Sequence, residues 1–385
     1  MSHVNLYKKE CIMKNPCVTS RWLPLAAVLA LAGCGGGSDN EPGLTSDNTG
    51  LPEGMVEKTL PAASDEVYVN LETGELVDPS DTWHLKASRL TFNLNGGESG
   101  TGNVGGALAV AQDDFYKDNG DPDENVFTNA SASSELEHLL GPFEAPAAWQ
   151  TDGLQSAFGS WETWSSYDYS TGQISALSDI GYLVRSAEGN SFARMKVVSF
   201  DFPTRANQGI RDFEFEFSVQ GAGEVAFSDQ PVTFTPPADY DGGDACFDFD
   251  SGQVVDCDTS DTWDVMVGFS GYNWYLRSNS GPSGSGDGGA SGPIGWDELD
   301  SYEADPGVPQ IYAQDSTGGV FSEHTWYAYN LLGNHKIWPN FRTYLIKADI
   351  DETEASVWAL QIVNYYDDDG VSGNPTIRWH RVTLN

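Results

Sequence analysis

Four short motifs occur twice along this chain of 385 residues, in the same order both times. The first copies lie at 71–83, 95–107, 164–183 and 195–200, and the second copies at 249–263, 279–290, 326–345 and 360–365. One such match could arise by chance, but four matches in the same order indicate a duplicated unit. We therefore expect two successive copies of one domain, at 65–225 and 243–385, joined by a linker at 226–242.

The sequence around these motifs alternates between apolar and polar residues. Residues 213–219 read Phe-Glu-Phe-Glu-Phe-Ser-Val, and residues 358–365 read Trp-Ala-Leu-Gln-Ile-Val-Asn-Tyr. Period-two alternation rich in aromatic and β-branched residues is typical of half-buried strands. Helical periodicity is scarce, with 133–140 the best short candidate. The fold class is therefore predicted to be all-β, as two antiparallel-sheet domains, with the glycine-rich segment of each copy forming a loop beside the sheet or over a ligand.

The N-terminal segment has the pattern of an export signal. Lys14 and Arg21 precede an apolar run at 23–32, which ends in Leu-Ala-Gly and then Cys34. This run is shorter than the roughly 20 apolar residues that a membrane span needs. We expect a signal peptide with a lipobox at 1–33, translated from Met1 or from Met13, and lipidation of Cys34.

The residues after Cys34 are predicted to be a tether. Residues 34–64 are rich in Gly, Ser, Asp and Pro and cannot bury enough apolar surface to order themselves. Gly35 directly after the lipidated cysteine favours an outer-membrane lipoprotein, at the cell surface or alternatively on the periplasmic face.

Beyond the anchor the chain has two cysteines, Cys246 and Cys257. They bracket two short strand-like runs around Ser251-Gly252, so a hairpin could bring the thiols face to face. In the oxidising environment outside the cytoplasm we expect them to form a disulfide.

Charge and motifs exclude several classes of function. The formal net charge is -38, which repels nucleic acid and anionic lipid headgroups, so we expect no nucleic-acid partner and membrane contact through the lipid anchor only. The sequence contains no Gly-x-Ser-x-Gly, His-Glu-x-x-His or P-loop motif. We therefore do not expect an enzyme.

The motifs of the first copy resemble those of the HmuY family. The resemblance rests on the Asp-x-Trp at 81–83, the Asn-Gly-rich loop at 95–107, Trp-x-x-Tyr at 164–167, Tyr-Leu-Val-Arg at 182–185 and Lys-Val-Val-Ser-Phe at 196–200. Members of this family are all-β envelope lipoproteins that bind haem beside a TonB-dependent outer-membrane receptor. The resemblance implies a lipoprotein that captures haem and passes it to such a receptor. Because the chain has no Cys-x-x-Cys-His, haem b would be bound without covalent attachment.

Haem needs an apolar, largely aromatic slot and one or two axial donors. His324 and His335 flank the Trp-x-x-Tyr of the second copy and are the leading candidates for iron ligands, and His138 is the third. The candidates for aromatic contacts in the pocket are Tyr329, Trp338 and Phe341. The alternative for each histidine is a purely structural role.

A second class of function stays open, a non-catalytic envelope module that binds or adheres to glycan or protein. Its stability could depend on Ca²⁺, which prefers oxygen ligands in turn-forming loops. Asp118, Asp121 and Asp123 supply such ligands, although not at the spacing of an EF-hand loop.

Overall fold

The computed structural model describes residues 51–201, 211–236, 243–270, 273–299 and 311–385. The expected signal at 1–33, the lipidation site Cys34 and most of the tether lie outside these residues. Within them the prediction of an all-β protein is confirmed, because nearly all regular structure is antiparallel sheet. None of the described helices is long and apolar enough to cross a membrane.

Strands from both ends of the described chain form one unit, which we call the terminal lobe. Its strands are β1 (Val56–Thr59), β2 (Val67–Asn70), β3 (Glu75–Val77), β4 (Leu85–Ser88), β5 (Thr91–Leu94), β6 (Gly105–Val110), β20 (Tyr327–Tyr329), β21 (Ile337–Pro339), β22 (Thr343–Lys347), β23 (Val357–Tyr366) and β24 (Ser372–Val382). They form a five-stranded sheet of order β1-β24-β23-β22-β6, a four-stranded sheet of order β3-β2-β4-β5 and the hairpin β20-β21. Its short helices are η1 (Asp113–Phe115), α1 (Glu124–Asn129), α2 (Glu137–Leu140) and α4 (Val320–Glu323).

The middle of the chain forms a second unit, which we call the inserted lobe. Its strands are β8 (Ser165–Asp168), β9 (Gln173–Ala176), β10 (Ile180–Arg185), β11 (Phe192–Asp201), β12 (Arg211–Gln220), β13 (Val232–Phe234), β14 (Gly243–Asp248), β15 (Gln253–Val255), β16 (Val265–Ser270), β17 (Asn273–Ser278) and β18 (Gly289–Gly295). The sheet orders are β13-β12-β11-β10-β18 and β15-β14-β16-β17, with the hairpin β8-β9. Its short helices are η2 (Trp161–Thr163), η3 (Gly281–Ser283) and α3 (Trp296–Leu299).

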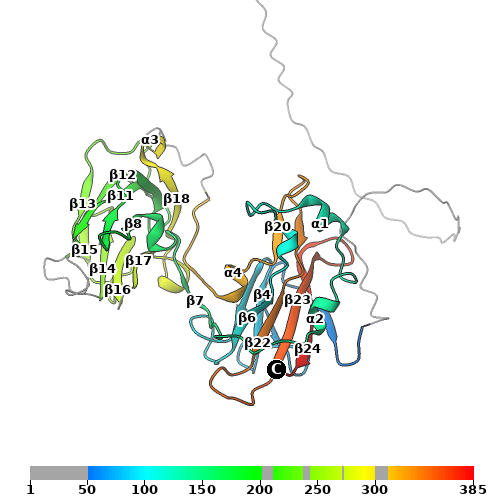
Figure 1. Ribbon diagram of the computed structural model, residues 1–385. Coiled ribbons are helices and arrows are strands. Elements are labelled where there is room, and N and C mark those ends of the chain that lie inside the picture. The colour runs from blue at the N-terminus through cyan, green and yellow to red at the C-terminus, as the bar shows by residue number, and fades with distance from the viewer. Residues whose placement is uncertain (1–50, 202–210, 237–242, 271–272, 300–310) are drawn as a thin grey trace, which may run out of the picture. The chain divides into compact units, whose positions relative to one another are not determined.

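The two lobes have the same strand order but do not follow the domain boundaries expected from the repeat. The early strand β6 pairs with the late strand β22. Strand β10, which precedes the expected linker at 226–242, pairs with β18, which follows it. In Figure 1 blue and cyan strands accordingly share the terminal lobe with orange and red ones. The structure therefore differs from two contiguous domains at 65–225 and 243–385, because the long-range pairing of sheet edges is not encoded in local alternation.

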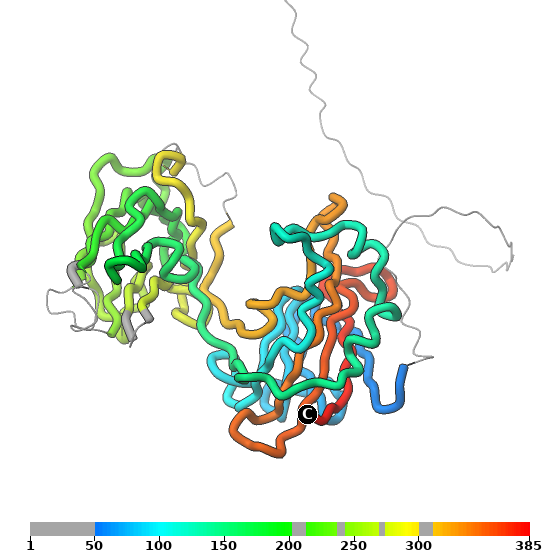
Figure 2. Tube along the Cα trace, viewed as in Figure 1, coloured from blue at the N-terminus to red at the C-terminus, as the bar shows by residue number. Residues whose placement is uncertain are grey.

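The chain crosses between the lobes twice, as Figure 2 shows. The outgoing segment contains β7 (Gly153–Gln155), and the returning segment contains β19 (Ser316–Gly318). These two strands pair antiparallel with each other.

Period-two alternation places one face of each sheet in a core. In the inserted lobe Phe213, Phe215 and Phe217 of β12 are all buried, and they pack with Phe234 and Phe247. In the terminal lobe the core contains Trp326, Trp358 and Trp379 together with Tyr344, all of them buried between the two sheets. The aromatic abundance of the sequence is therefore used largely to fill these two cores.

The expected disulfide between Cys246 and Cys257 is present, with Cα atoms 5.3 Å apart, and it closes the hairpin of β14 and β15. A bond across a sequence separation of 11 residues should stabilise by about 2–3 kcal/mol, because the closed loop is short. We expect Cys246→Ser/Cys257→Ser to lower the unfolding free energy of the inserted lobe by that amount in chemical denaturation. Reduction of the wild-type protein should give the same loss, and reduction of the double variant should give none.

Asp264 makes the inserted lobe sensitive to pH. Burial raises the pKa of this carboxyl group to about 8, although its oxygens accept hydrogen bonds from the backbone N–H groups of Ala187 and Phe249. The folded lobe therefore holds a proton that the unfolded chain releases near pH 4, and this contribution to stability is lost as the pH rises through about 8. We expect the unfolding free energy to fall between about pH 5 and 8 more steeply in the wild type than in Asp264→Asn, as measured by urea denaturation at a series of pH values. Equal slopes in the two proteins would contradict this assignment.

Candidate functional site

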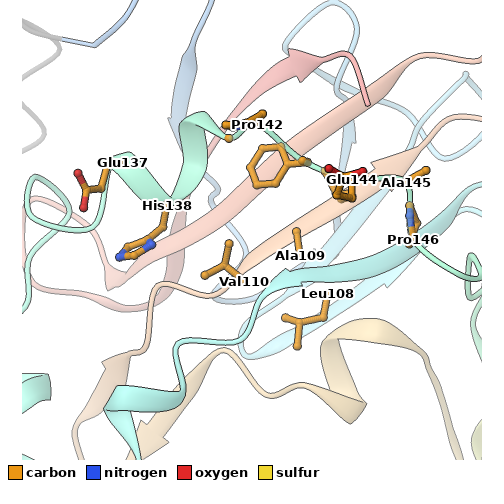
Figure 3. A pocket seen from close by; sticks show the side chains of 12 residues that line it. Leu108, Ala109, Val110, Glu137, His138, Pro142, Glu144, Ala145 and Pro146 are labelled. Atoms are coloured by element: carbon orange, nitrogen blue, oxygen red, sulfur yellow. The ribbon is translucent and has the colours of Figure 1, made fainter. Parts of the chain in front are cut away.

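A cavity of about 460 Å³ lies in the terminal lobe, between the edge strand β6 and the segment 137–146. Its apolar lining comes from Leu108, Ala109, Val110, Pro142, Phe143, Ala145, Pro146 and Leu345. Figure 3 shows His138 at one end of this space, the side chains of β6 along one side, and Glu144 to Pro146 at the other end. The volume lies within the range of pockets that hold small molecules and cofactors.

His138 is the histidine of this cavity, and it sits on α2. Its side chain is 38% exposed, and its Nε2 atom lies 3.6 Å from Oε2 of Glu135, one turn earlier in the chain. The same Glu135 oxygen accepts a hydrogen bond of 2.8 Å from Nε2 of Gln112, which holds the carboxylate in place. His138 therefore presents an imidazole beside a carboxylate at one end of the cavity.

The helix that carries His138 is tied to the sheet beneath it. Leu139 is fully buried against Leu345 and its neighbours. The backbone carbonyl of His138 accepts a hydrogen bond of 3.0 Å from Thr343 Oγ1, and Nε2 of His380 lies 2.7 Å from the carbonyl oxygen of Leu139. The four residues of α2 are therefore held by tertiary contacts, since a helix this short has little stability of its own.

A buried network of hydrogen bonds connects the sheet to the turn before α2. Arg378 is 1% exposed and donates through Nε and Nη2 to Oε1 of Gln361, at 2.9 and 2.6 Å. Nε2 of Gln361 donates in turn to the backbone carbonyls of Phe341 and Glu135. Burial lowers the pKa of Arg378 to about 10, so its charge is retained near neutral pH. The network connects β23 and β24 to the residue that faces His138.

The other two histidine candidates are not brought together. His324 ends α4 before the base of the β20-β21 hairpin, whereas His335 lies in the hairpin turn. Instead His335 is paired with Tyr329, whose hydroxyl group lies 2.6 Å from Nδ1 of the ring. Tyr329 is 58% exposed, so this pair stands on the surface of the hairpin.

The remaining aromatic candidates belong to a core. Trp338 and Phe341 are each 5% exposed and pack with Phe115 and Phe127 beneath the hairpin. Of the six candidates for ligands and aromatic contacts, His138 is the one that lines the cavity between β6 and segment 137–146.

The calcium ligands expected at Asp118, Asp121 and Asp123 do not form a site. Asp123 instead caps α1 by accepting a hydrogen bond of 2.9 Å from the backbone N–H of Asn125. Over the described part of the chain, no group of three or more His, Cys, Asp or Glu side chains is arranged to hold a metal ion. The acidic run is used for turns and a helix cap, for which Asp is favoured without any metal.

Several residues of the cavity were not predicted. Leu108 and Val110 lie on an edge strand, and Phe143 follows the turn after α2. The available signal was the Glu-x-x-His pair at 135–138, whose spacing can bring a carboxylate beside an imidazole. No motif marks the apolar part of the lining.

Comparison with protein families gives one finding. The model of the family described as HmuY protein matches residues 62–215. This match begins before β2 and runs through β7 into β12, so it covers strands of both lobes. A search of curated proteins finds no match.

Proposed function

The chain belongs to the HmuY family through residues 62–215, and from this premise we propose that it binds haem b reversibly in the cavity of the terminal lobe. The observation that carries the choice of site is the position of His138 at a cavity of about 460 Å³ that is lined by both apolar and polar side chains. The lining supplies an imidazole nitrogen and several apolar side chains, and haem binding needs an axial donor of this kind and apolar contacts. Bound haem would supply an iron that can be carried and released, and no catalytic role is proposed for the chain.

His138 would hold the iron through the ring nitrogen that does not face Glu135. The carboxylate of Glu135 lies 3.6 Å from Nε2 of His138, so Nδ1 is the ring nitrogen that would face the iron. Leu108, Val110 and Phe143 would contact the flat apolar face of the macrocycle.

Charge at the cavity orients the ligand. Glu137 and Glu144 line the cavity, and both are exposed. Carboxylates repel the anionic propionates of haem, so the propionates would extend into solvent and away from these side chains. A haem held in this way can be withdrawn by a partner without passing through the lobe.

We propose that the partner is a TonB-dependent outer-membrane receptor, and that the chain delivers haem from a lipid anchor on Cys34 at the cell surface. Three features support delivery over storage. The sequence has no Cys-x-x-Cys-His motif for covalent attachment of haem, the cavity opens at a sheet edge, and the sequence predicts a long tether before the first lobe.

Haem titration tests the proposal. We expect the mature protein to bind one haem per chain, with a Soret band shifted from that of free haem and a difference spectrum typical of nitrogen ligation. A glycan or protein that binds while haem produces no saturable Soret change would favour the envelope binding or adhesion module.

Glu135 should tune this binding without touching haem. In Glu135→Gln the His138 ring loses its charged partner while the side-chain shape is kept. We expect haem affinity to fall by about 10-fold, as is usual for partners of metal-bound histidines. Glu137→Gln removes an equal charge from the adjacent turn and serves as the control, for which we expect no loss of affinity.

A further inference from the structure

The two crossover strands leave their lobes at equivalent places. Just before β7, Asp152 accepts a hydrogen bond of 3.0 Å from the backbone N–H of Leu94. Just before β19, Asp315 accepts one of 3.4 Å from the backbone N–H of Ser278. Leu94 and Ser278 occupy the same position in the two copies, directly before the asparagine of each glycine-rich loop.

The glycine-rich loops beside these aspartates make the same backbone contacts in both copies. Asn95 Oδ1 accepts from the backbone N–H of Gly102, as Asn279 Oδ1 does from that of Gly286, at 3.0 and 2.9 Å. Gly97 and Gly281 share a left-handed backbone, with φ values of +63° and +53°. A Cβ atom would lie 2.0 Å from the carbonyl oxygen of Asp152 at the first glycine and 2.1 Å from that of Asp315 at the second. Both copies therefore need glycine at this position, where the loop backbone contacts the carbonyl group of the aspartate.

Beyond each crossover the chain also enters equivalent structure. Phe158 follows Asp152 by six residues and is buried in the inserted lobe against Tyr182. Phe321 follows Asp315 by six residues and is buried in the terminal lobe against Tyr344. The partner strands agree as well, since β10 pairs antiparallel with β18 in one lobe and β22 pairs antiparallel with β6 in the other.

We infer that the two copies of the repeated unit have exchanged their C-terminal halves within one chain. The terminal lobe consists of the first half of copy one and the second half of copy two. The inserted lobe consists of the second half of copy one and the first half of copy two. The family match over 62–215 is an independent sign, because it treats as one unit a stretch that the structure divides at β7. Pairing between β7 and β19 would be absent if each copy folded on itself, so it stabilises the exchanged form.

The exchange makes the terminal-lobe cavity a joint product of both copies. Most of its lining comes from the first copy, but Leu345 on β22 and the sheet that supports α2 come from the second. This inference does not rest on haem, since it concerns strand pairing alone.

Cleavage of the expected linker tests the exchange in the complete mature chain. A protease site inserted between residues 238 and 241 would divide the chain after β13, and both cysteines of the disulfide stay in the second piece. In the exchanged form the pieces share two lobes, so we expect the cut protein to keep the mass of the uncut chain in native mass spectrometry and gel filtration. Pieces that separate without denaturant would overturn the inference.

A pair of cysteine variants gives the second readout, in a chain with Cys34→Ser. Thr59 Oγ1 lies 2.8 Å from Thr376 Oγ1 across β1 and β24, so we expect Thr59→Cys/Thr376→Cys to join the two pieces by a disulfide after cleavage. Glu214 on β12 occupies the position that corresponds to Thr376 in the other lobe, and it is exposed. Thr59→Cys/Glu214→Cys should form a bond only if each copy folds on itself. A bond in this second variant and none in the first would contradict the exchange.

Discussion

Haem affinity is expected to fall by about 100-fold or more in His138→Ala, with a change in the Soret band that indicates the loss of a nitrogen ligand. The reason is that His138 is the histidine that lines the cavity and has a carboxylate 3.6 Å from its ring. Removing a carboxylate partner alone costs about 10-fold to 100-fold in metal affinity, and loss of the ligand itself should cost at least as much. Absorbance titration with haem measures the change.

His335→Ala is the matched control for this experiment. His335 is exposed in the turn of the β20-β21 hairpin and is hydrogen-bonded to Tyr329. We expect its loss to leave haem affinity within about 2-fold of the wild type, since surface substitutions away from a site have small effects. Loss of binding in His335→Ala with retention in His138→Ala would move the site to the hairpin.

Trp379→Ala is expected to reduce the stability of the terminal lobe by about 3–5 kcal/mol, the usual cost of removing a large aromatic side chain from a core. Trp379 is 1% exposed, and its Nε1 donates a hydrogen bond of 2.9 Å to the carbonyl oxygen of Leu71, directly after β2 of the facing sheet. The substitution would leave both a cavity and an unpaired carbonyl group. Calorimetry and chemical denaturation measure the loss.

Tyr169→Ala is the control for stability. Tyr169 is 91% exposed in the β8-β9 hairpin of the inserted lobe, so its removal should change the unfolding free energy by less than about 0.5 kcal/mol. A loss in Trp379→Ala no larger than that of the control would show that the core between the two sheets is not formed as described.

Local patterns were sufficient for the parts of the fold that local physics determines. The alternation at 213–219 predicted β12, and the turn between two short strands predicted the bond between Cys246 and Cys257. The helix expected at 133–140 forms over 137–140 only, because Ser131 and Ser134 use their side chains in a local turn. Such competition by serine hydroxyl groups for backbone donors is not visible in apolar periodicity.

Pairing between distant strands could not be predicted in the same way. The repeat indicated two sets of equivalent strands. The sequence of neither copy indicates whether the edge strand β6 pairs with β22 or with its equivalent β10, or which of the two pairs with β18. Both pairings satisfy the same pattern of buried residues, and the choice between them depends on contacts such as β7 with β19. Contiguity along the chain was therefore a poor guide to the lobes.

The candidate site was predicted only in part for a related reason. His138 was among the proposed ligands, but a position near Trp-x-x-Tyr favoured His324 and His335. The structure uses Trp326 as core at 2% exposure and places His335 beside Tyr329. The cavity is formed by segments far apart in sequence, here β6, α2 and β22. Short sequence motifs do not indicate which distant segments come into contact.

Hydrogen exchange measured by mass spectrometry, with and without haem, tests the central claim most directly. The account predicts that one equivalent of haem slows exchange of the backbone amides at 105–110 and 137–146, around the cavity lined by His138. The peptides of the inserted lobe should exchange at the same rate in both samples. Protection confined to the β20-β21 hairpin or to the inserted lobe, or no protection at saturating haem, would contradict it.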